Sequence, residues 1–121
     1  MNLSMSQIKY LLIIYELTAS GEVRSNDIAK KMNISRTSVH KMLNKLAREK
    51  LIAKEKYSSL TLLDEGIKKA ECLYEKYVQI SQYFNHVMCL SEDIAAKSAF
   101  ALIGALDEDA VTQICKAFKQ H

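Results

Sequence analysis

One stretch of the sequence combines residue types and spacing suited to contacts with nucleic acid. From Ser35 to Lys50, apolar side chains recur three and four residues apart, which predicts an amphipathic helix. Its apolar face is formed by Val39, Met42, Leu43 and Leu46. The opposite face carries cations and hydrogen-bonding groups, which suit phosphates and base edges. These polar residues are Arg36, Thr37, Ser38, His40, Lys41, Asn44 and Lys45.

The segment before this helix predicts the first half of a helix-turn-helix. Ser25–Met32 is a short amphipathic stretch with Ile28 and Ala29 on one side. A polar turn follows, in which Ile34 is expected to fill the angle between the two helices. Ser35 is a natural N-cap, because its hydroxyl can accept a hydrogen bond from a free amide in the first turn. The helix Ser35–Lys50 is therefore expected to lie in a DNA major groove.

The segment after the helix predicts a β-wing. Leu51–Lys56 and Ser59–Leu63 have the composition of two strands, and Tyr57–Ser59 is the expected turn between them. Glu22–Arg24 could add a third strand. The fold class that follows is mainly α, with an N-terminal winged helix-turn-helix. A helical bundle with a solvated polar face is the alternative, but it does not explain the hairpin.

Charge is distributed unevenly along the chain, and its basic part coincides with these elements. The net charge is +3, but Glu22–Lys56 alone holds ten Lys and Arg against four acids, a balance of +6. A basic segment of this kind is the electrostatic footprint of a phosphate-binding surface, so double-stranded DNA is the expected partner. The predicted DNA contacts are Arg24, Ser35, Arg36, Thr37, Ser38, His40, Lys41, Asn44, Lys45, Lys54, Lys56, Tyr57 and Ser58. For His40, an idle surface position is the alternative.

The remaining sequence predicts four further helices. The first spans Ser6–Ala19 and ends at Gly21; the longest runs from Asp64 to about Met88; two more begin at Ser91 and Asp107. We expect a DNA-binding domain over residues 1–63 and a helical dimerisation domain over 64–121. A homodimer would read both halves of a palindromic operator. The predicted dimer contacts form a stripe on the longest helix: Leu73, Tyr74, Tyr77, Ile80 and Phe84. A core role or a small-molecule pocket is the alternative for its tyrosines.

Composition excludes several other classes of protein. No apolar run approaches the roughly 18 residues that span a bilayer, and no cleavable signal peptide is found, so a cytoplasmic protein without membrane contact is expected. The sequence has no Ser-His-Asp arrangement, no glycine-rich phosphate loop and no paired carboxylates of catalytic type, so we expect neither an enzyme nor a cofactor. Its three cysteines are isolated, which argues against a disulfide framework.

The order of short motifs resembles the diphtheria-toxin-repressor-like (DtxR/MntR) regulators, in a short form. The motifs are Tyr15-Glu16-Leu17, Asp27-Ile-Ala, Ile34-Ser-x-x-Ser-Val39, Met42-Leu, Leu51-Ile, Tyr57, Leu62-x-x-x-Gly66 and Leu90-Ser-Glu-Asp. The resemblance covers Ser4 to about Phe118. It implies a dimeric repressor that binds its operator when loaded with Fe(II) or Mn(II).

The metal ligands that the resemblance implies are missing from this sequence. Their positions fall on Lys9, Leu12, Tyr77, Ser81, Ala96, Phe100, Ile103 and Gly104. None of these is a plausible ligand, because hard divalent ions need several carboxylates or imidazoles. We therefore expect DNA binding without activation through the family's metal site. We hypothesise that Leu12, Phe100 and Ile103 pack the vacated site.

Three alternatives remain open from sequence alone. The first is a metal or thiol sensor with other ligands, drawn from Cys72, His86, Cys89, Cys115 and His121. In the simpler interpretation Cys72 and Cys115 are core or interface fillers, while Cys89 is an exposed thiol and a possible redox switch. The second is a protein-interaction adaptor that keeps the fold without the operator. The third is a regulator of the multiple-antibiotic-resistance type, which shares the winged helix but normally has dimer helices from both termini, whereas here only a short leader precedes Ser6.

Overall fold

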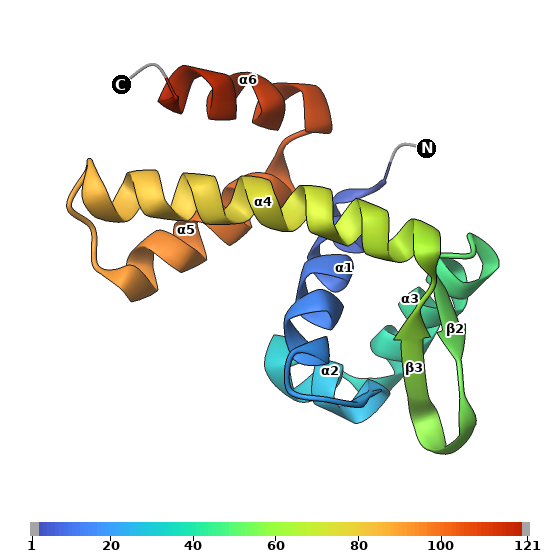
Figure 1. The fold of residues 1–121 in the computed structure, drawn as a ribbon. Coiled ribbons are helices and arrows are strands. Elements are labelled where there is room, and N and C mark those ends of the chain that lie inside the picture. The colour runs from blue at the N-terminus through green and yellow to red at the C-terminus, as the bar shows by residue number, and fades with distance from the viewer. Residues whose placement is uncertain (1–2, 120–121) are drawn as a thin grey trace. The chain divides into compact units, whose positions relative to one another are not determined.

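The computed structural model describes residues 3–119 as a mainly helical chain with a small antiparallel sheet, as predicted (Figure 1). In chain order the elements are α1 (Met5–Thr18), β1 (Val23–Arg24), α2 (Ser25–Met32), α3 (Arg36–Arg48), β2 (Ile52–Lys54), the 3₁₀ turn η1 (Lys56–Ser58), β3 (Ser59–Leu62), α4 (Asp64–His86), α5 (Glu92–Ala105) and α6 (Glu108–Phe118). No helix of the described residues is long and apolar enough to cross a membrane.

The chain divides into two compact units. The winged unit comprises Tyr10–Glu71, and the helical unit comprises Cys72–His121 together with the residues up to Lys9. The division falls inside α1 and α4, whereas the sequence suggested a single boundary after Leu63. That boundary stays a prediction, since compactness in one chain does not establish which part folds alone.

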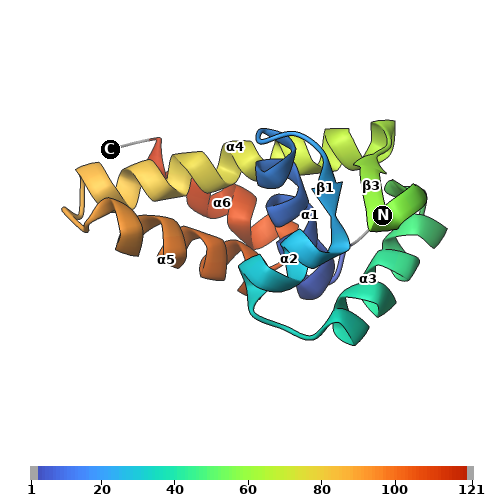
Figure 2. The same cartoon turned by 90° about the horizontal axis from the view of Figure 1, so that it is seen from below.

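The wing of the winged unit is a three-stranded sheet in the order β1-β3-β2. Both pairings are antiparallel: Val23 lies opposite Leu60, and Ile52 lies opposite Leu62. The third strand predicted at residues 22–24 is thus confirmed, although it is only two residues long. Figure 2 shows β1 and β3 from below, beside the helices of the same unit. The winged helix-turn-helix predicted from sequence is the fold observed.

The core of the winged unit forms where the predicted apolar faces meet. Its fully buried side chains include Leu11, Ile14, Ile28, Val39, Leu43, Leu46, Leu51 and Ile52. Ile34 is an exception, because it was expected between the two helices and is 37% exposed. The chain turns at Asn33, which has a left-handed φ of 54°, and the Ile34 amide donates to the Ala29 carbonyl. This turn directs the chain toward α3 and leaves the Ile34 side chain at the surface.

The first helix begins one residue earlier than predicted because Ser4 and Gln7 cap it reciprocally. The Ser4 amide donates to Gln7 Oε1 at 2.8 Å, and the Gln7 amide donates to Ser4 Oγ at 3.2 Å. This capping box satisfies two donors that the helix would otherwise leave free. At its other end α1 stops before Gly21, whose φ of +114° suits glycine as the sequence analysis expected. Between these ends every residue from Tyr10 to Ile14 is buried.

Gly66 permits a close approach between the first turn of α4 and the chain that leads into the wing. A β-carbon at position 66 would collide with the Leu51 carbonyl oxygen and lie 3.3 Å from the Leu62 side chain. The Leu51 oxygen cannot easily move, because it accepts a hydrogen bond of 3.0 Å from the Leu63 amide. Glycine at this position is therefore required by space rather than by backbone conformation.

Gly66→Ala is expected to lower the free energy of unfolding by about 1–3 kcal/mol, because the methyl group overpacks this contact. Urea denaturation followed by circular dichroism measures the change. Lys68→Ala, an exposed substitution in the same turn of helix, is the control and is expected to change stability by no more than about 0.5 kcal/mol. A Gly66→Ala protein as stable as the wild type would contradict the close approach.

The helical unit is held together by caps and by contacts to α6. Ser91 caps α5 by accepting from the Ile94 amide, and Asp107 caps α6 by accepting from the Ala110 amide, as the sequence predicted. Phe118 of α6 stacks on Tyr83 of α4, with ring centroids 3.8 Å apart and ring planes 3° apart. The edge of Phe84 meets the same ring at 6.2 Å. Further along, Gln79 Nε2 donates to the Cys115 carbonyl at 2.8 Å. These contacts fix α6 against α4 (Figure 1).

Two predicted dimer contacts in the helical unit need correction. Leu73 and Ile80 were predicted as dimer contacts, but both are buried within the chain and offer no surface to a partner. Ile94 of α5 is exposed, and the buried small residues of this helix are Ala95, Ala99 and Gly104. Cys72 and Cys115 were predicted as core or interface fillers; Cys115 is buried, whereas Cys72 is exposed and is not a core filler.

Candidate nucleic-acid interface

All thirteen residues predicted to contact DNA are exposed in the winged unit. Seven of them belong to α3, and Ser35 caps that helix. The Ser35 Oγ accepts from the Ser38 amide at 3.2 Å and donates to Ser38 Oγ at 3.1 Å. The Ser35 and Ser38 hydroxyls thus fix the first turn of α3, where helix-turn-helix proteins place their base contacts.

One exposed cation of α3, Arg48, was not among the predicted DNA contacts. Arg48 is exposed and follows Thr37, Lys41 and Asn44 at spacings of four, three and four residues, so the four side chains share one face of the helix. This face lies opposite the buried Val39. The spacing alone could have identified Arg48, because it continues the same stripe by one turn.

A hydrogen bond joins α3 to the wing. Lys54 of β2 donates from Nζ to Asn44 Oδ1 at 2.7 Å. Both side chains were predicted to contact DNA, but nothing in the sequence predicts that they contact each other across ten residues. The bond orients the Asn44 amide and places the Lys54 ammonium beside the polar face of α3. Helix and wing therefore present one continuous polar edge at this point.

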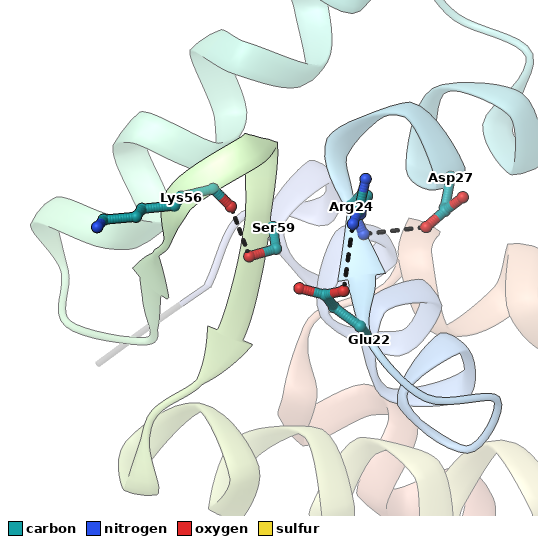
Figure 3. A network of polar contacts seen from close by, with 5 residues as sticks. All are labelled: Glu22, Arg24, Asp27, Lys56 and Ser59. Atoms are coloured by element: carbon teal, nitrogen blue, oxygen red, sulfur yellow. Dashed lines mark hydrogen bonds and ion pairs between the residues drawn. The ribbon is translucent and has the colours of Figure 1, made fainter.

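The tip of the wing carries an exposed aromatic ring on an unusual backbone. Tyr57 is 84% exposed, and both Tyr57 and Ser58 have left-handed conformations, with φ of 59° and 61°. Left-handed backbone is unfavourable for residues other than glycine and costs on the order of 1 kcal/mol each. Ser59 holds the turn closed, because its Oγ donates to the Lys56 carbonyl at 2.9 Å (Figure 3). The turn thus presents Tyr57 and Ser58 to solvent.

Arg24 lies on the neighbouring strand and is partly neutralised. Its guanidinium pairs with Glu22 at 3.4 Å, and its backbone amide donates to Asp27 Oδ2 at 3.0 Å (Figure 3). Both partners of the ion pair are more than half exposed, so water screens the pairing and it contributes little to stability. The Arg24 guanidinium can bind a phosphate if its ion pair with Glu22 breaks.

These elements define a winged helix-turn-helix protein of the DNA-binding class. Residues 2–60 match the family model described as the iron dependent repressor, N-terminal DNA binding domain. This match and the relatives below support a member of the DtxR/MntR-like family, which consists of transcription regulators and not of enzymes. The resemblance inferred from the motifs is thereby confirmed.

Individual relatives agree with this assignment. The chain is 27% identical over 92 residues to an uncharacterized HTH-type transcriptional regulator of Methanocaldococcus jannaschii, covering 76% of this chain and 74% of that protein. It is 33% identical over 75 residues to the HTH-type transcriptional regulator MntR of Lysinibacillus sphaericus, covering 61% and 54%. A solved structure of the manganese regulator SloR aligns with a TM-score of 0.74 and 28% identity, covering 93% and 53%. The chain thus spans about half the length of the last two proteins.

The residues of this chain do not fit the iron or manganese that the family implies. Within residues 3–119, no group of three or more His, Cys, Asp or Glu side chains is placed to hold a metal ion. The positions implied by the resemblance hold Lys9, aliphatic and aromatic side chains, one serine and a glycine. A lysine ammonium repels a divalent cation, and the two neutral hydroxyls among the other groups do not replace the several carboxylates or imidazoles that such ions require.

The cysteine and histidine alternative gains no support from the described residues. Cys72 and Cys89 are exposed, and Cys115 is buried. Burial raises the pKa of the Cys115 thiol, although the Lys76 and Lys119 ammonium groups act in the lowering direction. Cys89 is exposed as expected and has a left-handed φ of 61°, in a turn where glycine would be at ease. His121 lies outside the described residues.

Proposed function

We propose that this protein is a sequence-specific repressor that binds a palindromic operator as a homodimer in the cytoplasm, without activation by iron or manganese at the family's site. The observation that carries the proposal is the exposed stripe of Thr37, Lys41, Asn44 and Arg48 on α3, joined to the wing by the Lys54 hydrogen bond. Such a surface supplies hydrogen-bond donors to base edges and cations to the phosphates on both sides of a major groove.

The proposed docking assigns different roles to the two ends of this surface. The first turn of α3, with Arg36, Thr37 and Lys41, enters the major groove and contacts bases. Arg48 lies two turns beyond Lys41, so it meets the phosphate backbone. The wing, with Lys56 and the exposed Tyr57, contacts the backbone beside the groove. Phosphate contacts position the protein, and base contacts select the sequence.

The homodimer is supported by apolar surface in the helical unit. Three large apolar side chains at and after the end of α4 are about half exposed: Val87, Met88 and Ile94. The predicted contacts Tyr74, Tyr77 and Phe84 also keep part of their surface. Exposed apolar side chains in one region typically mark a protein contact. We propose a second copy of this chain as the occupant, because a two-fold dimer matches a palindromic site.

Met88→Glu is expected to shift the protein from dimer toward monomer, because an interface that buries this side chain would have to bury a charge. Sedimentation velocity at several concentrations measures the change. Lys97→Ala, on an exposed part of α5 where Lys97 pairs with Asp93, is the matched control and should leave the assembly unchanged. A Met88→Glu protein that dimerises as tightly as the wild type would rule out this surface.

The experiment that tests the function is binding of the purified protein to its own upstream DNA. Measurements are made with excess chelator and with added Mn(II) or Fe(II), each at two salt concentrations. We expect tight binding with chelator, no gain with metal, and a steep loss of affinity with salt. Binding that appears only with metal would refute the metal-independent part of the proposal. If no condition gives sequence-specific binding, the proposal that this protein is a DNA-binding regulator is refuted.

A further inference from the structure

The fifth helix contains a glycine that its backbone conformation does not explain. Gly104 is buried near the end of α5, and its φ lies outside the left-handed region. Glycine is less favourable than alanine inside a helix, because it loses more backbone freedom on folding. A buried helical glycine therefore points to a neighbour that lies close against the backbone at this position.

That neighbour is the side chain of Lys9, which belongs to the same unit. The position that a β-carbon on residue 104 would take lies 2.5 Å from Lys9 Cε, 3.0 Å from Cγ and 3.3 Å from Cδ. The aliphatic stem of Lys9 thus lies directly on the backbone of α5 at Gly104. The glycine leaves room for the lysine stem, which covers its surface, and a side chain at position 104 would make the flexible stem shift.

Both residues stand at positions where the family resemblance implies metal ligands. In a metal-loaded relative, ligands from two helices joined by one ion would hold those helices together. Here the first turns of α1 and the end of α5 are joined by direct packing of Lys9 on Gly104. The Lys9 side chain is only partly exposed. No hydrogen bond or ion pair to its ammonium is found within the described residues, so the contact made by its stem is what holds it.

We propose that the Lys9–Gly104 contact replaces the metal ion as the clamp between α1 and α5, and that it keeps the regulator in its DNA-binding state without metal. The stem supplies the packing, and the ammonium excludes a divalent ion from the same place. This inference rests on the proposed function for its regulatory meaning. The α1 helix continues from Lys9 into the core of the winged unit, so a change at position 9 is expected to reach operator affinity through one helix.

A double-mutant cycle tests the clamp independently of DNA. The full-length variants are Lys9→Ala, Gly104→Ala, the Lys9→Ala/Gly104→Ala double and Lys9→Met, each compared with wild type by thermal unfolding in chelator. We expect Lys9→Ala to lower the melting temperature by about 4 °C or more, and Gly104→Ala to lower it by less, because the flexible stem can shift and alanine favours the helix. The double should lose clearly less than the sum, because the new methyl group occupies the space that the stem vacates. Lys9→Met keeps the stem and should lose little.

Three results of this cycle would overturn the proposal. Additive losses would show that the two positions are not coupled. A loss in Lys9→Met as large as in Lys9→Ala would show that the stem does not provide the packing. A rise of several degrees in the wild-type melting temperature with Mn(II) or Fe(II) would show that a metal still binds and stabilises the fold.

Operator binding then separates the clamp from the proposed function. We expect Lys9→Ala to bind the operator several-fold more weakly than wild type in chelator, with Lys9→Met and the control Lys97→Ala close to wild type. Unchanged affinity in Lys9→Ala would overturn the regulatory role of the contact. If the wild type binds no operator while the cycle still shows coupling, the proposed function fails and the clamp remains as a structural contact only.

Discussion

Arg36→Ala combined with Lys41→Ala is expected to weaken operator binding by at least about 30-fold without unfolding the protein. Each lost contact of this kind costs about 1–3 kcal/mol of binding free energy. The loss of two contacts therefore costs at least about 2 kcal/mol, which corresponds to about 30-fold in affinity. Both side chains are exposed on α3, and no hydrogen bond or ion pair is found for either within the described residues. Their removal should therefore change the free energy of unfolding by no more than about 0.5 kcal/mol.

The measurement is a fluorescence anisotropy titration with operator and with unrelated DNA at several salt concentrations. If one of the two side chains meets a phosphate, the dependence of log affinity on log salt should also fall by about one unit. Lys68→Ala together with Lys97→Ala removes the same charge from α4 and α5 and is the matched control. Operator affinity that falls equally in the control would mean that overall charge, rather than the α3 face, determines binding.

Phe118→Ala is expected to detach α6 from α4 and expose Cys115. The ring of Phe118 stacks on Tyr83 and meets the edge of Phe84, so its loss should cost about 2 kcal/mol. A detached α6 has 11 residues, too few to remain helical in water. A local opening easier by 2 kcal/mol should occur roughly 30 times more often.

Thiol reactivity measures this opening. In the wild type, Cys72 and Cys89 should react quickly with an aromatic disulfide reagent, and Cys115 slowly, because burial both blocks access and raises the pKa of its thiol. In Phe118→Ala the third thiol should react about 30-fold faster. Cys115→Ser identifies the slow thiol, and Gln113→Ala at an exposed position of α6 is the control. An unchanged slow rate in Phe118→Ala would show that Phe118 does not hold α6.

The sequence predicted the winged unit well because its signals are local. The extent of α2 over Ser25–Met32, the Ser35 cap and the turn at Tyr57 each depend on residues within one or two turns of each other. The alternation between buried and exposed positions on α3 likewise follows from a helical period that the sequence displays. The third strand, expected at residues 22–24, is also present, with Val23 opposite Leu60.

Placements that depend on distant packing could not be obtained in this way. A helical stripe does not say which part of the chain covers it, so Leu73 and Ile80 were assigned to a partner although the chain buries them itself. The predicted burial of Ile34 was wrong for a related reason, because the left-handed backbone of Asn33 sets the direction of the turn. The Asn44–Lys54 bond and the contact of Lys9 with Gly104 join residues whose separation in sequence carries no periodic signal.

The contact between Lys9 and Gly104 also bears on how this regulator can evolve. A carboxylate at position 9 alone would leave a void over the glycine, and a larger residue at position 104 alone would collide with the lysine stem. Under the proposed clamp, a single change toward a metal ligand at either position is therefore expected to lower stability. Natural proteins stand only a little above the stability that function requires. Positions 9 and 104 are therefore expected to change together rather than one at a time.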